Sequence, residues 1–272
     1  MGTVATVTLG GSYAGRIGPV TEQVHEIFDQ LDRELSSYRR DSAISRLGDQ
    51  AGVAPMAVPQ DTFRVLNLSK HFGDLSDGAF DVTVAPLVSL WGFNGAPAPD
   101  ALPSEQEIRE RQKLVDYRRL VLRDGTAYLP VQGMAVDVGA IGKGYALDRA
   151  YDHCLSDGVR DFLIDFSGNM RAAGRPAWGE KWEVGVRDPF DRSRIIGRIA
   201  LASGMALATS GDYERFVTIA NQRFSHIIDP RTGYPVAGTA SVTVLCPDAT
   251  SADALSTSFF VVGLKGAGEL LK

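Results

Sequence analysis

Six short β-prone runs follow one another in the second half of the chain, with little helical periodicity between them. They cover residues 162–166, 182–187, 195–201, 205–209, 223–228 and 241–246. Successive strands joined by short connections pair antiparallel, whereas a parallel sheet needs a long crossover between its strands. We therefore expect an α+β fold with mixed, largely antiparallel sheets flanked by helices, rather than a doubly wound parallel sheet.

Two further segments earlier in the chain support this expectation. Residues 3–9 alternate in polarity, which is typical of a strand. Residues 119–129 place Asp124 and Gly125 between two β-prone halves, and this pair tolerates the positive φ of a tight hairpin turn. The sequence predicts an antiparallel hairpin there.

Apolar residues spaced three and four apart predict helices over residues 20–35, 61–72, 141–155 and 252–262. Thr21 and Ser251 are the expected N-caps of the first and last of these helices. A further helix is expected to begin at Ser104, because Glu107 completes a capping box three residues later.

Composition excludes several classes of protein. The 272 residues are 44% hydrophobic, enough for a sizeable core, and carry a formal net charge of −5. No Lys and Arg cluster, so we expect no nucleic-acid partner. No apolar stretch is long enough to span a membrane, and neither a signal peptide nor a lipobox opens the chain. Cys154 and Cys246 lack a zinc-ligand spacing.

The most informative motif is the strand, glycine-rich bend and helix of residues 136–148. A helix N-terminus offers free N–H groups, and Lys143 adds a positive charge, so the unit suits a phosphate. The Walker A and GxGxxG spacings are absent. A tight strand-to-helix turn with a solvated lysine is the alternative.

Asp253 and Thr257 fall four residues apart in the last expected helix, which places a carboxylate and a hydroxyl on one face. With a backbone carbonyl they could hold Mg²⁺, which needs few protein ligands when water and phosphate complete its shell. In the alternative, Asp253 only complements the helix dipole and Thr257 packs in the core.

His226 stands out because the chain has four histidines, and it could accept a proton from a hydroxyl during phosphoryl transfer. It could equally orient a loop. Tyr38 and the pair Phe80-Asp81 could stack on and bond to an aromatic heterocycle, or serve as packing and turn residues.

In order along the chain, these segments resemble the ApbE family of FAD:protein FMN transferases. The matching pieces are MGT at 1–3, SSYRRDSAISRL at 36–47, DGAFDVTVAPLVSLWGF at 77–93, VDVGAIGKGYALD at 136–148, ATSGDYERF at 208–216, SHIIDPRTGYP at 225–235 and SADALSTSFFVVG at 251–263. The resemblance implies one ApbE-like (T-fold-like) domain over residues 1–272, trimmed at both ends.

The resemblance also implies a reaction. An enzyme of this kind binds FAD, uses Mg²⁺, and joins FMN through its phosphate to a Thr or Ser hydroxyl of a protein, releasing AMP. The acceptor would carry an Asp-Gly-Ala-Thr-like motif, commonly in a redox subunit. Family habit suggests a periplasmic or membrane-anchored protein outside the cytoplasm.

Site residues follow from the resemblance, motif by motif. The metal would be held by Asp253 and Thr257, with Ala140 and Ser256 as further oxygen donors. The residues expected to contact FAD are Met1, Tyr38, Ala79, Phe80, Asp81, Asp137, Lys143 and Ile227. His226 is the expected base, with Asp229 as the alternative.

The chain departs from the family pattern at two positions. Gly48 stands where the family commonly has Asn, and Phe166-Ser-Gly-Asn169 replaces the usual Gly-Gly-Asp or Gly-Gly-Asn segment. The first departure leaves open the balance between transfer of FMN and hydrolysis of FAD. The alternatives are therefore an FAD pyrophosphatase and a non-catalytic FAD-binding protein.

Overall fold

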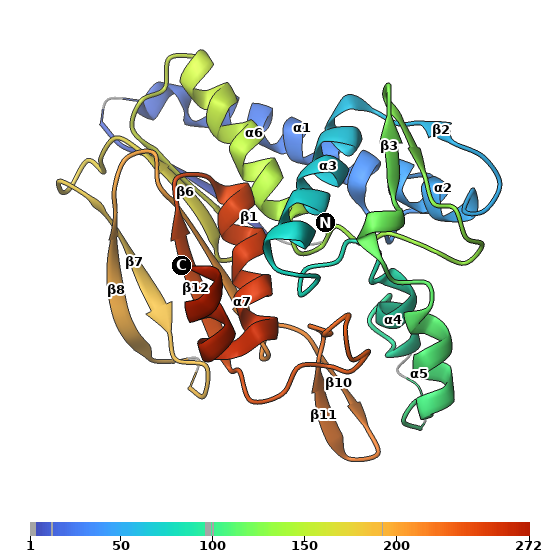
Figure 1. Ribbon diagram of the computed structural model, residues 1–272. Helices are drawn as coiled ribbons and strands as arrows, with labels where there is room; N and C mark the ends of the chain where they lie inside the picture. The colour runs from blue at the N-terminus through green and yellow to red at the C-terminus, as the bar shows by residue number, and fades with distance from the viewer. Residues whose placement is uncertain (1–3, 12, 96–98, 100, 192) are drawn as a thin grey trace. The chain divides into compact units, whose positions relative to one another are not determined.

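A computed structural model describes residues 4–11, 13–95, 99, 101–191 and 193–272 (Figure 1). The chain divides into two compact units. Unit 1 comprises Met1–Leu31, Ile141–Ser210 and Ser241–Ser256, and unit 2 comprises Asp32–Ala140, Gly211–Ala240 and Thr257–Lys272.

Unit 1 is built on a five-stranded sheet of order β1-β5-β6-β9-β12. The strands are β1 (Ala5–Leu9), β5 (Phe162–Phe166), β6 (Asn169–Ala173), β9 (Ala206–Gly211) and β12 (Ser241–Cys246). The pairs β1–β5, β5–β6 and β6–β9 are all antiparallel. The antiparallel organisation expected from the strand-rich second half is confirmed.

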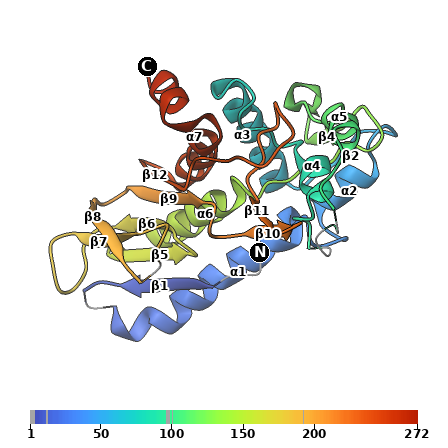
Figure 2. The ribbon, with the colours of Figure 1, turned by 90° about the horizontal axis from the view of Figure 1, so that it is seen from below.

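Helices α1 (Ile17–Leu35) and α6 (Gly142–Ser156) cover one face of this sheet. Phe28 of α1 stacks on Phe166 of β5 with ring centroids 4.5 Å apart. Asp148 of α6 accepts a hydrogen bond from Arg171 of β6. Figure 2 shows α6 lying along β5 and β6. The apolar stripe of α1 therefore packs on a sheet, as its periodicity predicts.

The opposite face of the sheet is covered by a two-stranded ribbon, β7 (Trp182–Arg187) and β8 (Ile195–Leu201). Trp182 and Leu201 of the ribbon form a buried cluster with Ala172 and Leu207 of the sheet. The Trp182 indole N–H donates to the carbonyl of Ala173 at 3.0 Å, so the ring is fixed as well as buried.

The described residues of unit 2 include several short or medium helices and two small sheets. The helices are α2 (Ala43–Asp49), α3 (Gln60–Leu75), α4 (Ala85–Leu90) and α5 (Glu105–Gln112). One sheet has the order β2-β4-β3, with β2 at Met56–Ala57, β4 at Thr126–Tyr128 and β3 at Val121–Arg123. The other pairs β10 (Phe216–Ile219) with β11 (Gln222–Ser225).

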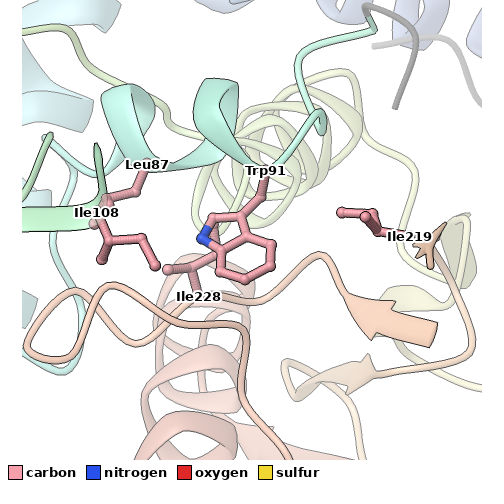
Figure 3. Close-up of a cluster of buried hydrophobic side chains, with 5 residues drawn as sticks. All are labelled: Leu87, Trp91, Ile108, Ile219 and Ile228. Atoms are coloured by element: carbon pink, nitrogen blue, oxygen red, sulfur yellow. The ribbon is translucent and has the colours of Figure 1, made fainter. Parts of the chain in front are cut away.

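A buried cluster in unit 2 holds the segment that carries His226. Trp91, the residue directly after α4, lies among Leu87, Ile108, Ile219 and Ile228 (Figure 3). The Trp91 indole N–H also donates to the carbonyl of Gly233 at 2.9 Å. The chain on both sides of Ile228 is therefore anchored in a core, which fixes the position of His226 two residues earlier.

Two local predictions are confirmed in detail. Ser104 and Glu107 form the capping box at the start of α5. Asp124 and Gly125, with φ values of 49° and 76°, turn β3 into β4.

The expected N-caps are wrong at two helices. Helix α1 begins at Ile17 rather than after Thr21, because the first turn of a helix tolerates the proline at position 19. The last helix, α7 (Ala249–Leu270), begins before Ser251, and the Asp248 carboxylate accepts the Ser251 N–H as a cap.

Helix and strand ends also differ from prediction. Helix α7 continues past residue 262 through a kink at Gly263. The strand expected over 223–228 ends at Ser225, because Ile228 leaves it to form a bridge with Pro235. Among the described residues, no helix is both long and apolar enough to cross a membrane.

Candidate active site

The first turn of α6 and the first turns of α7 meet in unit 1. The backbone N–H of Gly144 donates to Oδ2 of Asp253 at 2.9 Å. A Cβ at Gly144 would lie 2.8 Å from the Cβ of Asp253, so a larger residue would separate the two helices. Asp253 is 4% exposed. The glycine-rich bend thus allows a carboxylate to reach the positive end of α6.

Asp148 of α6 makes the corresponding contact with the start of α7. Its carboxylate accepts the backbone N–H groups of Ala249 and Thr250 at 2.8 and 2.9 Å. It also accepts the Thr250 hydroxyl and pairs with Arg171 at 2.7 Å. Each helix therefore supplies a carboxylate that accepts N–H groups at the start of the other.

The charge of Asp148 is balanced between burial and its partners. Burial raises the pKa of Asp148, while the Thr250 hydroxyl, the Arg171 guanidinium and the two N–H groups oppose that rise. Arg171 lies over the ring of Tyr151 at 3.8 Å, which holds the guanidinium in place. This network fixes the N-terminus of α7 and, one turn later, Asp253.

The other predicted metal ligands lie near these helix starts in the sequence. Ser256 is fully buried, and its hydroxyl bonds to the Asp253 carbonyl at 2.9 Å and to the Ser210 hydroxyl at 2.8 Å. Thr257 follows in α7, one helical turn after Asp253. Ala140 lies two residues before α6, and Lys143 is the second residue of that helix.

The donor set suits a hard cation. Within the described part of the chain, no three His, Cys, Asp or Glu side chains cluster as a metal site. The predicted set instead contains one carboxylate, from Asp253, together with hydroxyl and carbonyl oxygens. Mg²⁺ is bound in this way when substrate phosphate and water supply the remaining ligands.

In unit 2, the predicted FAD contacts begin at a turn after α3. Ala79 and Phe80 are buried. The Asp81 carboxylate accepts the N–H and hydroxyl of Thr83, at 2.8 and 2.6 Å, and the N–H of Tyr117 at 3.0 Å. Burial raises the pKa of Asp81, and these bonds oppose that rise. Asp81 thus organises its own loop.

Asp137 lies beside this loop, because its N–H donates to the carbonyl of Val82 at 2.8 Å. The N–H of Gly139 bonds to its carboxylate at 2.7 Å. Burial raises the pKa of Asp137, whereas the Gly139 N–H and the charge of Arg215 lower it. The unit therefore brings together two of the acidic residues that the sequence singles out.

Tyr38 and His226 meet through Arg215. The Arg215 guanidinium donates to the Tyr38 hydroxyl at 3.0 Å, and that hydroxyl donates to the Phe93 carbonyl at 3.3 Å. The Arg215 carbonyl is bonded by the His226 N–H at 3.2 Å and by Nδ1 at 3.0 Å. Since a carbonyl only accepts, Nδ1 carries a proton and the lone pair of the neutral ring lies on Nε2.

Asp229 has a different environment from His226. Its two carboxylate oxygens accept a bidentate pair of bonds from the Arg231 side chain, each 2.9 Å long, and Oδ1 also accepts the Arg231 N–H. The Asp229 bond raises the pKa of Arg231. Ile227, between the two candidate bases, is buried, and Met1 lies outside the described residues.

Comparison with known proteins identifies the family of this chain. The sequence signature of the ApbE family matches residues 1–272. The chain belongs to the ApbE family.

Relatives and solved structures agree with this membership. The FAD:protein FMN transferase of Vibrio cholerae is 32% identical over 242 residues, covering 89% of this chain and 72% of the relative. That of Escherichia coli is 31% identical over 277 residues, covering 100% and 79%. The crystal structure of an ApbE protein from Thermotoga maritima has a TM-score of 0.89 at 33% identity, covering 98% and 89%. The α+β fold expected from the ApbE resemblance is confirmed.

Sequence reasoning did not single out three residues that bond to, or help to position, the predicted site residues of their own unit. Asp148 and Arg171 bridge α6, β6 and α7, and Arg215 joins Tyr38 to His226. Asp148 ends the glycine-rich motif, and Arg215 is the only basic residue of the ATSGDYERF segment, so a signal existed for both. At Gly48, a Cβ would lie 3.4 Å from that of Ala135, so the glycine is not required by space.

Proposed function

We propose that this chain transfers FMN from FAD to a Thr or Ser hydroxyl of a target protein, releasing AMP, with Mg²⁺ as the cofactor. Membership of the ApbE family assigns flavin transfer. The structural observation that best supports the metal and phosphate chemistry is the Asp253 carboxylate bonded to Gly144 at the first turn of α6. A carboxylate at the positive end of a helix suits a cation and a phosphate held together.

We assign Asp253 as the anionic ligand of Mg²⁺, with oxygens of Thr257, Ser256 and Ala140 as the other protein donors. When bound, Mg²⁺ offsets negative charge on the pyrophosphate as the bond to AMP breaks. The bond from Gly144 to Oδ2 orients the Asp253 carboxylate in advance. Lys143, in the same turn, adds a second positive charge for the pyrophosphate.

The acceptor hydroxyl oxygen forms a bond to the phosphorus of the FMN half, and the phosphorus–oxygen bond to AMP breaks. The hydroxyl proton must leave at the same time. We assign this proton to His226 Nε2, because the Arg215 carbonyl holds Nδ1 protonated. His226 is preferred to Asp229, whose carboxylate oxygens are both occupied by Arg231.

The residues of unit 2 are proposed to hold the rest of FAD. Tyr38 is 54% exposed and offers its ring for stacking on a heterocycle. Ala79, Phe80, Asp81, Asp137 and Ile227 complete the expected contacts, with Met1 from the chain start. Asp81 and Asp137 lie in neighbouring backbone segments, because the Asp137 N–H donates to the carbonyl of Val82, the residue after Asp81.

We propose a redox subunit with an Asp-Gly-Ala-Thr-like motif as the acceptor. Holding the motif hydroxyl in line with the leaving oxygen lowers the entropic barrier to transfer, which makes recognition of a protein segment useful.

The test is to incubate the chain with FAD, Mg²⁺ and an acceptor peptide carrying Asp-Gly-Ala-Thr, and to separate FMN ester, free FMN and AMP by chromatography. We expect equal amounts of FMN ester and AMP, and neither product in EDTA. Glu269→Ala removes an exposed carboxylate from the helix that carries Asp253, so it is the matched control for variants of Asp253. This change should leave the yield of FMN ester unchanged.

Two outcomes would contradict transfer. Free FMN and AMP without ester would identify an FAD pyrophosphatase, and intact FAD that stays bound in EDTA would identify a non-catalytic FAD-binding protein.

A further inference from the structure

Asn169, the first residue of β6, has a buried side chain amide without a partner. It is 1% exposed, and neither Nδ2 nor Oδ1 has a hydrogen-bond partner within the described part of the chain. Folded proteins leave very few buried polar atoms unpaired, because such atoms lose water and gain nothing in return. An amide with both ends in this state matches a ligand that can accept and donate.

The register of the β5–β6 hairpin fixes the face on which Asn169 lies. Ser167 and Gly168, with φ values of 52° and 89°, form the two-residue turn, and Asn169 pairs with Phe166. Directly opposed residues of antiparallel strands share a face. Because Phe166 stacks on Phe28, Asn169 lies on the helix-covered face of the sheet.

Two contacts give the direction of α6 along that face. Far from the hairpin turn, Phe162 of β5 packs on Tyr151, with ring centroids 5.3 Å apart. Nearer the turn, Arg171 of β6 bonds to Asp148. Helix α6 therefore approaches its N-terminus as the strands approach the hairpin turn (Figure 2).

Asn169 lies beyond Arg171 in the same direction. Two residues of a strand span about 6.6 Å, and a helix rises about 1.5 Å per residue. The step from Arg171 to Asn169 thus corresponds to roughly four helical residues, from Asp148 to Gly144. Extrapolated in this way, the unpartnered amide lies near the first turn of α6.

That turn is where the proposed function puts a pyrophosphate. It presents backbone N–H groups and the positive end of a helix of 15 residues, and it carries Lys143. The Gly144 N–H is already bonded to Asp253. A phosphoryl oxygen at this turn would accept from an amide N–H, and a water bound to a cation would donate to an amide oxygen.

We propose that Asn169 is a further substrate-binding residue, whose Nδ2 donates to a phosphoryl oxygen of the FAD pyrophosphate and whose Oδ1 accepts from the water of the accompanying cation. This inference rests on the proposed function, since it names the ligand of the same site. Asn169 binds the pyrophosphate without adding charge, so it complements Lys143 and Asp253.

The deciding variant is Asn169→Leu, which has a similar branched shape and no polar atoms. A purely structural amide without partners would be replaced at no loss, so the variant would melt at the same or a higher temperature and bind FAD normally. If the Asn169 amide binds the ligand, the melting temperature is the same as in that case but the FAD affinity is not. The melting temperature without FAD holds or rises, and the Kd for FAD in Mg²⁺, measured by calorimetry, increases about tenfold or more.

Thr62→Val is the matched control. Thr62 is also fully buried, its hydroxyl is also without a partner among the described residues, and it lies in α3, which carries none of the proposed ligand contacts. This change should leave the Kd for FAD unchanged. Should Asn169→Leu fail to fold, Asn169→Ala, which cannot overpack the site, carries the same expectation.

An FAD Kd within twofold of the unchanged protein in the folded Asn169 variant would overturn the inference. Because calorimetry measures binding, this result is separate from the proposed function, which fails when the unchanged chain binds FAD but forms no FMN ester. Failure of the unchanged chain to bind FAD would overturn both.

Discussion

The hydrogen bonds around Asp148 and Asp253 in unit 1 differ in kind from those around Tyr38 and His226 in unit 2. Asp148 and Arg171 have side chains only 16% and 12% exposed, and their partners include two backbone N–H groups at a helix start. Tyr38, by contrast, is exposed, and its hydroxyl bonds to Arg215, which is also exposed.

The two sets of proposed functional residues are therefore expected to contribute differently. Charges that stabilise a transition state act most strongly when they are buried and oriented before the reaction. Groups that receive a flexible ligand can form some of their contacts only on binding. We therefore expect variants in unit 1 to alter rate and stability, and variants in unit 2 to alter mainly the binding or proton-transfer step.

The largest expected effect is that of Asp253→Asn. The amide oxygen can still accept the Gly144 N–H, but the charge that we propose holds Mg²⁺ is lost. We expect FMN transfer to fall about 10³-fold, equivalent to about 4 kcal/mol. The melting temperature should change little, and the Mg²⁺ concentration for half-maximal rate should rise. Full activity of this variant at low Mg²⁺ would show that Asp253 is not a ligand of the metal.

The second effect concerns stability. Asp148→Ala leaves the Arg171 guanidinium buried without its carboxylate, and the Ala249 and Thr250 N–H groups at the start of α7 lose their acceptor while the Asp248 cap remains. Together these losses should cost about 3 kcal/mol. The melting temperature should fall by roughly 6 to 12 °C. Asp41→Ala removes the exposed pair with Arg39 and is the matched control, expected to shift melting by about 1 °C or less. Equal falls in melting temperature for the two variants would mean that burial does not make the Asp148–Arg171 pair more stabilising than the Asp41–Arg39 pair.

The same variant gives a pH prediction. Burial raises the pKa of Asp148, so the folded chain keeps the proton at a pH where the unfolded chain has released it. The stabilisation linked to this group is therefore complete in acid, below the ordinary Asp value of about 3.9, and is lost as pH rises through the raised pKa. The melting difference between the unchanged chain and Asp148→Ala should narrow as pH rises from about 4.

A third variant, His226→Gln, tests the base in unit 2. Removing a general base typically lowers rate about 10²-fold. We expect a loss of this size in kcat with little change in the KM for FAD. Asp229→Asn should leave kcat nearly unchanged. A loss of kcat in that variant as large as the one in His226→Gln would assign the role of base to Asp229.

The smallest effect is expected for Tyr38→Phe. The ring remains for stacking, while the exposed bonds to Arg215 and the Phe93 carbonyl are lost. We expect the KM for FAD to rise by about threefold, equivalent to less than 1 kcal/mol, with kcat and melting temperature unchanged. A large fall in kcat would show that this exposed group is as preorganised as the helix starts of unit 1.

The sequence predicts local structure correctly where a pair of nearby residues determines it. Ser104 with Glu107 and Asp124 with Gly125 specify a helix start and a turn whatever surrounds them, and both predictions are confirmed. Strand β6 has no β-branched residue, and no strand was predicted there. It forms because β5 pairs with all five of its residues, which is a tertiary cause.

The site shows the same limit. Family motifs named Asp253, Lys143 and His226, but nothing local links Asp148 to the start of α7, about a hundred residues later. The reciprocal capping of α6 and α7 depends on the close approach permitted by Gly144, and the orphaned amide of Asn169 depends on strand register. Such features follow from packing, which single-sequence patterns do not contain.

The most direct test of the account is the intact mass of the acceptor. Two peptides that differ only in the Thr or Val of the Asp-Gly-Ala-Thr motif would be incubated with the chain, FAD and Mg²⁺, and then weighed by mass spectrometry. The account predicts that the Thr peptide gains the mass of an FMN ester and the Val peptide gains nothing. An unchanged Thr peptide beside free FMN and AMP would contradict it.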